Sequence, residues 1–274
     1  MLRHKLSMLM ASRKGFSVEP DILQNGQVSP AYVGVLDMPL TAVQIKFAQQ
    51  VVAELQPTIR SLFASILRDR VVCIEAARRI VERLMSETST RTLINTTHLE
   101  DMGEDTGHHS LVVSALMIAF GRNLGLSEET VRLLGLGGLL HDVGKMVLPV
   151  RLLQKPSEFS VAELIVIRTH PELGHQMIVQ IEGAPKAVLD ICLHHHERYD
   201  GTGYPHELAG KDIPHVALIA AICDVYAALT AARPYKRAWS RSEAIGAMLG
   251  SRGHFDPELL ASFVNLLTAD CASE

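Results

Sequence analysis

The segment Leu139-Leu140-His141-Asp142-Val143-Gly144-Lys145 places an imidazole and a carboxylate side by side at the end of an apolar run. Neighbouring side chains on a helix point in different directions, so these two converge on one point only if the helix ends there. Gly144 permits such a turn. A converging His-Asp pair can bridge two metal ions, with the imidazole on one ion and the carboxylate on both. The alternative is a buried histidine beside a helix-end aspartate, and the dipeptide alone does not separate the two.

Histidines are concentrated around this segment. The chain has 13, and ten of them fall between His108 and His215. His109 lies 32 residues before His141, His170 lies 29 residues after it, and the run His194-His195-His196-Glu197 follows. A buried imidazole needs a hydrogen-bond partner or a metal, and core packing alone does not account for so many.

Asp224 is the acidic residue hardest to explain without a metal. It stands inside an apolar run that extends from Ala217 to Ala228. Burial of an unpaired carboxylate there would be costly, and a bound cation removes that cost. The mixture of His and Asp ligands suits Mn, Fe, Ni or Zn better than Ca or Mg, which prefer oxygen ligands.

The periodicity of apolar residues predicts an all-α protein, because no run of alternating strands is present. Thr41 and the pair Ser160 and Glu163 have the spacing of helix N-caps. We divide the chain into a helical N-terminal region, 1–100, which opens with an irregular arm over 1–40, and a helical catalytic domain, 101–274. The predicted helices cover 41–67, 71–85, 109–124, 127–141, 160–170, 171–181, 185–196, 213–231, 240–250 and a last segment from 256.

Composition narrows the class of protein. The 274 residues carry a net charge of −4, which argues against a nucleic-acid polymer as partner. No signal peptide is recognisable, and no apolar stretch reaches the roughly 20 residues of a membrane span. The four cysteines form no C-x-x-C pair and are typical of reduced residues in a cytoplasmic protein.

Together these residues resemble the HD-GYP subgroup of the HD-domain phosphohydrolases over about 105–265. The resemblance rests on His109, His141-Asp142, Gly144-Lys145, Pro149, His170, His195-His196-Glu197, Asp200-Gly201-Thr202-Gly203-Tyr204-Pro205, Gly210, Ile213-Pro214, Asp224, Arg233-Pro234-Tyr235-Lys236 and Phe255-Asp256-Pro257. It implies an all-α fold around two or three divalent metal ions, iron or manganese being expected. It also implies hydrolysis of cyclic di-GMP to pGpG or GMP in bacterial second-messenger signalling. The implied metal ligands are His109, His141, Asp142, His170, His195, His196 and Asp224.

The sequence departs from the family pattern at a few positions. A third metal ion would use Asp105, where the family usually has a longer Glu. His108 and His194 are extra imidazoles beside expected ligands, and the 32-residue spacing to His141 favours His109 over His108. We do not expect His175, His206 or His215 among the ligands.

The resemblance also suggests roles for residues around the metals. A water or hydroxide held between two ions would be the nucleophile, with Asp142 and Lys145 as catalytic residues. Lys145, Arg233, Lys236 and Tyr204 are the candidate substrate contacts. A solvated lysine or loop, or a purely structural tyrosine, is the alternative for each. The loop 200–205 is expected to shape the pocket and to offer a surface for a protein partner.

Two other functions stay open at this stage. The chain could be an inactive receptor that binds cyclic di-GMP without cleaving it, although the complete ligand set argues against this. It could also act on another cyclic dinucleotide, such as cyclic GMP-AMP, which the motif does not distinguish from cyclic di-GMP. We expect the N-terminal helices to serve homodimerisation or sensory coupling.

Overall fold

The computed structural model describes residues 22–24, 27–87, 89–96, 106–153, 155, 158–231 and 237–272. It confirms the predicted all-α fold, apart from a two-residue antiparallel pair of strands near the N-terminal end. The elements are β1 (Leu23–Gln24), β2 (Gln27–Val28), α2 (Pro30–Leu36), α3 (Ala42–Asp69), α4 (Ile74–Ser86), α5 (Thr90–Asn95), α6 (Thr106–Asn123), α7 (Glu128–Leu140), the 3-10 helix η2 (Val143–Val147), α8 (Val150–Leu153), α9 (Val161–Ile167), α10 (His170–Val179), α11 (Lys186–His194), the 3-10 helix η3 (Gly210–Asp212), α12 (His215–Thr230), α13 (Arg241–Gly250) and α14 (Pro257–Ala272).

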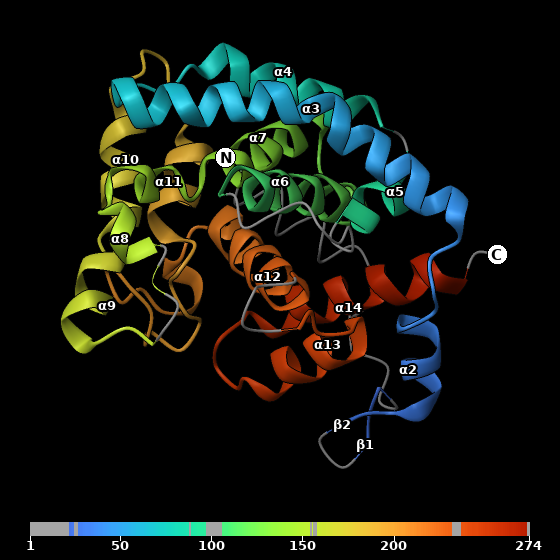
Figure 1. Ribbon diagram of the computed structural model, residues 1–274. Helices are drawn as coiled ribbons and strands as arrows, with labels where there is room; N and C mark the ends of the chain where they lie inside the picture. The colour runs from blue at the N-terminus through green and yellow to red at the C-terminus, as the bar shows by residue number, and fades with distance from the viewer. Residues whose placement is uncertain are drawn as a thin grey trace.

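The helices form layers around α6 and α7, which lie side by side in the middle of the molecule (Figure 1). The long helix α3 runs with α4 across one side of this pair. Helices α12, α13 and α14 lie on the opposite side, and α8 to α11 gather at one end. This arrangement brings α7 and α12 into contact with each other, and each of them into contact with α6 and α11. The residues that surround that junction form the site described below.

Several helices begin where side-chain caps predict. Thr41 Oγ1 accepts a hydrogen bond from the Gln44 amide at 3.3 Å, and Gln44 Oε1 accepts one from the Thr41 amide at 2.7 Å. Ser160 and Glu163 form the same reciprocal capping box at the start of α9. Each box satisfies amides that lack a partner in the first turn of a helix. The predicted starts of α3 and α9 are therefore confirmed.

Residues from both predicted regions share one apolar core. Ile80 and Val81 of α4 are buried in the same cluster as Leu134 and Leu136 of α7. A Cβ added at Gly135 would lie 3.1 Å from a methyl of Val81, so the two helices approach closely. The apolar core is therefore continuous across the predicted division at residue 100, and a separate function for residues 1–100 stays a prediction.

Helix α6 is buried on every side, since each residue from 110 to 121 is buried. Such a helix lies inside the protein rather than on its surface. Among the helices that the structure describes, none is both long and apolar enough to cross a membrane.

The sequence predicts an irregular arm over 1–40, but the structure has the helix α2 within it. One helix boundary is also wrong. The sequence reading placed His170 at the end of the helix that starts after Ser160, but α9 ends at Ile167 and His170 is the first residue of α10. Pro171 explains the difference, because a proline is well tolerated in the first turn of a helix, where its missing amide hydrogen is not needed.

Candidate metal centre

The His141-Asp142 pair lies where α7 ends. His141 is the C-cap residue, and Asp142 has left the helix with φ −99° and ψ 9°. Both side chains are buried, at 0% and 1% exposed. Gly144 follows in η2, and a Cβ there would lie 2.0 Å from the carbonyl oxygen of His170. The helix does end at the pair as predicted, and Gly144 is needed for the close approach of η2 to α10.

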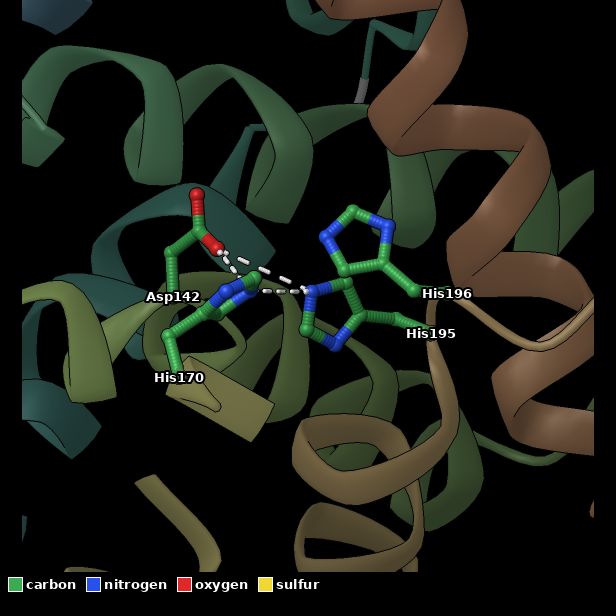
Figure 2. A group of neighbouring side chains, drawn as sticks. All are labelled: Asp142, His170, His195 and His196. Carbon is green, nitrogen blue, oxygen red and sulfur yellow. Dashed lines mark hydrogen bonds and ion pairs between the residues drawn. The ribbon is translucent and has the colours of Figure 1, made fainter. Parts of the chain in front are cut away.

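Asp142, His170, His195 and His196 form one of two adjoining groups of potential ligands at this position (Figure 2). Their donor atoms all lie within 4.8 Å of one another. His170 comes from the start of α10, and His195 and His196 follow α11. Figure 2 shows Asp142, His170 and His195 directed toward one another, with His196 beside His195. The Nε2 atoms of His170 and His195 are 3.3 Å apart.

His109, His141 and Asp224 form the second group, within the same 4.8 Å limit. His109 Nε2 lies 2.9 Å from Asp224 Oδ1, which joins α6 to α12 across 115 residues. His141 Nε2 lies 3.7 Å from the same oxygen. The register that the spacing favoured is therefore the one found, because His109 and not His108 belongs to this group.

The carboxylate of Asp142 connects the two groups. Its Oδ1 lies 3.1 Å from His170 Nε2 and 3.6 Å from His195 Nε2. Its Oδ2 lies 3.3 Å from His141 Nε2 and 3.9 Å from His109 Nε2. One oxygen thus faces each group, which is the geometry that a carboxylate needs to bridge two metal ions.

Three of the imidazoles are oriented by backbone carbonyls. The Nδ1 atoms of His141 and His170 lie 2.7 and 2.8 Å from the carbonyls of Gly138 and Ile167. His195 Nδ1 lies 3.0 Å from the carbonyl of Cys192. Each Nδ1–H can donate to its carbonyl, which leaves the lone pair on Nε2. Ligand histidines in metalloproteins are commonly oriented in this way.

Two buried atoms at the centre lack hydrogen bonds. Neither His141 Nε2 nor Asp142 Oδ1 has a hydrogen-bond partner among the described residues. Such atoms normally cost free energy, since buried polar groups are almost always satisfied. Divalent metal ions would satisfy both atoms, so this donor set fits a metal centre.

The charges of the group depend on one another. Burial opposes ionisation of Asp142, but Lys145 and His141 hold the pKa of its carboxyl well below the usual value. Burial also opposes ionisation of Asp224, whose pKa His109 and His141 lower. Burial alone would lower the pKa of His141, yet the two carboxylates raise it to about 10. Without metal, a protonated His141 supplies one positive charge beside the carboxylates of Asp142 and Asp224.

The structure places two of the predicted substrate contacts beside the centre. Lys145 Nζ donates to Asp142 Oδ2 at 2.5 Å and is 28% exposed. The ring of Tyr204 stacks on His196 at 4.8 Å, and the guanidinium carbon of Arg168 lies 5.2 Å from its centroid. Asp105, Arg233 and Lys236 lie outside the described residues, so their predicted roles stay predictions.

The loop that carries Tyr204 is held by its neighbours. Asp200 Oδ1 accepts hydrogen bonds from the amide and hydroxyl of Thr202 at 3.0 and 2.6 Å. A Cβ at Gly203 would lie 2.3 Å from the amide nitrogen of Arg198, so only glycine fits there. The buried carboxylate of Glu197 accepts from the amides of His206 and Leu208. These contacts explain why Tyr204 lies against a candidate ligand.

The sequence reading missed a third group. His194, Glu197 and His206 also bring potential ligand atoms within 4.8 Å of one another. His206 was not expected to be a ligand, and it belongs to neither group around Asp142. Its place beside His194 depends on the path of the loop, and the only signal in the sequence was an extra histidine on each side of Glu197.

Comparison with known proteins identifies relatives of this chain. A model of the HD domain family matches residues 65–259. A cyclic di-GMP phosphodiesterase of Pseudomonas aeruginosa is 36% identical over 254 residues, which cover 89% of this chain and 61% of that protein. A cyclic di-GMP phosphodiesterase response regulator of Xanthomonas campestris is 42% identical over 139 residues, covering 49% and 36%. A 3'3'-cGAMP-specific phosphodiesterase of Vibrio cholerae is 32% identical, covering 64% and 34%.

An HD-GYP protein from Bdellovibrio bacteriovorus has a similar solved structure, with a TM-score of 0.64, 24% identity and coverage of 85% of this chain and 75% of that one. The chain therefore belongs to the HD domain family, the wider family of the HD-GYP subgroup that its sequence resembles. The chain spans about three fifths of the Pseudomonas relative and about a third of the other two.

Proposed function

We propose that this chain is a metal-dependent phosphoric diester hydrolase that cleaves cyclic di-GMP to pGpG, GMP or both. The observation that carries the proposal is the position of Asp142, whose two carboxylate oxygens each face a separate group of histidines. A centre of two adjacent metal ions suits phosphodiester hydrolysis, because the two ions together can contact both the attacking and the leaving oxygen. The names of the Pseudomonas and Xanthomonas relatives support cyclic di-GMP as the substrate.

Asp142 and the six residues around it would hold the metals. His170, His195 and His196 would bind one ion, His109, His141 and Asp224 the other, and Asp142 both. When bound, such ions supply a water of lowered pKa and neutralise the charge of the phosphate. The mixed nitrogen and oxygen ligands suit Mn, Fe, Ni or Zn, and the resemblance to the HD-GYP subgroup favours iron or manganese among them. A third ion would use Asp105.

The residues beside the centre have roles of their own in this proposal. Lys145 neutralises negative charge, since its ammonium group lies at the bridging carboxylate and stays partly exposed to an incoming phosphate. Tyr204 keeps the ring of His196 in place by stacking. Burial and the nearby carboxylates raise the pKa of Tyr204, so its phenol stays protonated and can donate a hydrogen bond to substrate.

The direct test incubates the protein, loaded anaerobically with Mn or Fe, with cyclic di-GMP and with 3'3'-cyclic GMP-AMP in parallel. Separation of the products is expected to show faster conversion of cyclic di-GMP to linear pGpG or GMP. Faster cleavage of the hybrid dinucleotide would instead assign this chain the activity for which the Vibrio relative is named. Binding of cyclic di-GMP without turnover by either metal form would contradict an enzyme and support a receptor.

A further inference from the structure

The group His194, Glu197 and His206 has ligand chemistry of its own. His194 is the last residue of α11, Glu197 follows three residues later, and His206 lies beyond the loop that carries Tyr204. One donor atom from each lies within 4.8 Å of the others. The residues share no member with the two groups around Asp142, so this group would not compete with that centre for ligands.

One atom of this group is buried and has no hydrogen-bond partner among the described residues. His194 is 8% exposed, and its Nδ1 has no hydrogen-bond partner among the described residues. That nitrogen lies 3.7 Å from Glu197 Oε1, which is too far for a hydrogen bond. The rings of His194 and His206 are 5.3 Å apart. The buried nitrogen, the carboxylate and the second imidazole are therefore close together without satisfying the nitrogen.

The carboxylate of Glu197 is already oriented for a ligand role. Its Oε1 accepts from the His206 amide at 2.8 Å and its Oε2 from the Leu208 amide at 3.1 Å. Each carboxylate oxygen can accept a second contact, so these hydrogen bonds orient the carboxylate and leave it able to bind an ion. Hydrogen bonds of this kind typically support ligating carboxylates in metal sites.

We propose that His194, Glu197 and His206 bind a separate divalent ion of the zinc class. Two imidazoles and one glutamate are a ligand set that proteins use for Zn, with a further position left to solvent. His206 is exposed, so an ion can reach the group from outside. Calcium and magnesium are disfavoured, because two of the three ligands are nitrogens.

An ion at this position would fasten the loop to the end of α11. His206 is two residues from Tyr204, which stacks on His196, and His194 is two residues before His196 in the chain. The ion would therefore join the two ends of the segment from His194 to His206, which contains His196, a candidate ligand of the main centre. The expected consequence is a loop 200–208 that is more resistant to opening when zinc is present.

The test counts metal ions in His206→Ala, whose exposed side chain can be removed without emptying the core. Metal-free protein is equilibrated with Zn²⁺, freed of unbound metal and measured by elemental analysis. Wild type is expected to retain about one more zinc ion per chain than His206→Ala. His175→Ala removes a half-buried histidine outside all three groups and should match wild type.

Two further measurements separate this site from the main centre. Asp142→Asn should still lose one zinc ion when His206→Ala is added, since the two sites share no ligand. Anomalous diffraction at the zinc edge should show a peak between His194 and His206 in wild type. Equal zinc content in wild type and His206→Ala, with metal-free proteins of equal thermal stability, would overturn the proposal, as would the absence of that peak.

Discussion

Gly144 and the carbonyl oxygen of His170 lie so close that a Cβ on Gly144 would come within 2.0 Å of that oxygen. The contact is made by backbone on both sides, so no side-chain rotation can relieve it. We predict that Gly144→Ala pushes η2 away from α10 and separates Asp142 from His170, whose Nε2 lies 3.1 Å from Oδ1. Metal content and turnover should both fall steeply.

The matched control for this change is Gly34→Ala in α2, where an added Cβ would meet nothing within 4 Å. Replacing a helical glycine with alanine typically stabilises by about 0.5–1 kcal/mol. The control should therefore unfold at the same or a higher temperature and keep its metal. Normal metal content in Gly144→Ala would show that the approach of η2 to α10 does not set the geometry of the centre.

A second prediction concerns Tyr204, which stacks on His196. Tyr204→Leu removes the ring that supports this imidazole, and loss of such support typically lowers metal affinity or activity by roughly 10–100-fold. Tyr204→Phe keeps the ring and should retain metal affinity near that of wild type. Metal affinity measured by chelator competition distinguishes the two variants. Equal losses would assign the effect to the hydroxyl rather than to stacking.

A third prediction concerns Lys145, whose ammonium group contacts Asp142 and is partly exposed. Lys145→Met should lower kcat/KM by roughly 10²-fold, as loss of one preorganised charge contact to a reacting phosphate does. Its metal content should change much less, because Lys145 is not a ligand. Lys186→Met is the control, since that lysine pairs with Asp190 on the surface. A loss of metal equal to the loss of activity would reassign Lys145 to assembly of the centre.

A fourth prediction follows from the charge on His141. Its pKa of about 10 means that the folded, metal-free protein holds a proton there at pH 7.5. A raised pKa stabilises the folded state fully below the unfolded value of 6.5, and this stabilisation is lost as the pH rises through about 10. Metal must displace the proton, because a ligand imidazole is neutral.

Calorimetric titration of metal-free protein with Mn²⁺ at pH 7.5 tests this release. The heat of binding should differ between two buffers of different ionisation enthalpy, in proportion to the protons released. The apparent affinity should also rise as the pH approaches 10. Identical heats in both buffers would contradict a protonated His141.

Local signals were enough to predict most helices and the His-Asp pair. The capping box of Ser160 and Glu163 and the apolar run before His141 depend on neighbours in the chain, so the sequence contains them directly. The apolar pattern of α6 does not predict which of its residues face the site, because a helix buried on every side has no polar face to fix its register. The 32-residue spacing between His109 and His141 favoured His109 over His108, which periodicity alone did not.

Tertiary contacts account for what the sequence reading missed. His194 and His206 are brought together by a loop whose path depends on Glu197 accepting two amides. No periodicity encodes that path. The close contact between Gly144 and His170 is similar, since it depends on how η2 packs against α10 rather than on the turn that follows Asp142.

The central claim is that Asp142 joins two metal subsites into one hydrolytic centre. The most direct measurement compares Asp142→Asn with wild-type Asp142, both in the His206→Ala background so that the proposed zinc site is left out of the count. Metal content and hydrolysis of cyclic di-GMP are measured on the same samples. We expect about two ions and turnover with Asp142, and loss of both with Asn. Turnover by Asp142→Asn at the rate of its parent would contradict a bridging role for Asp142.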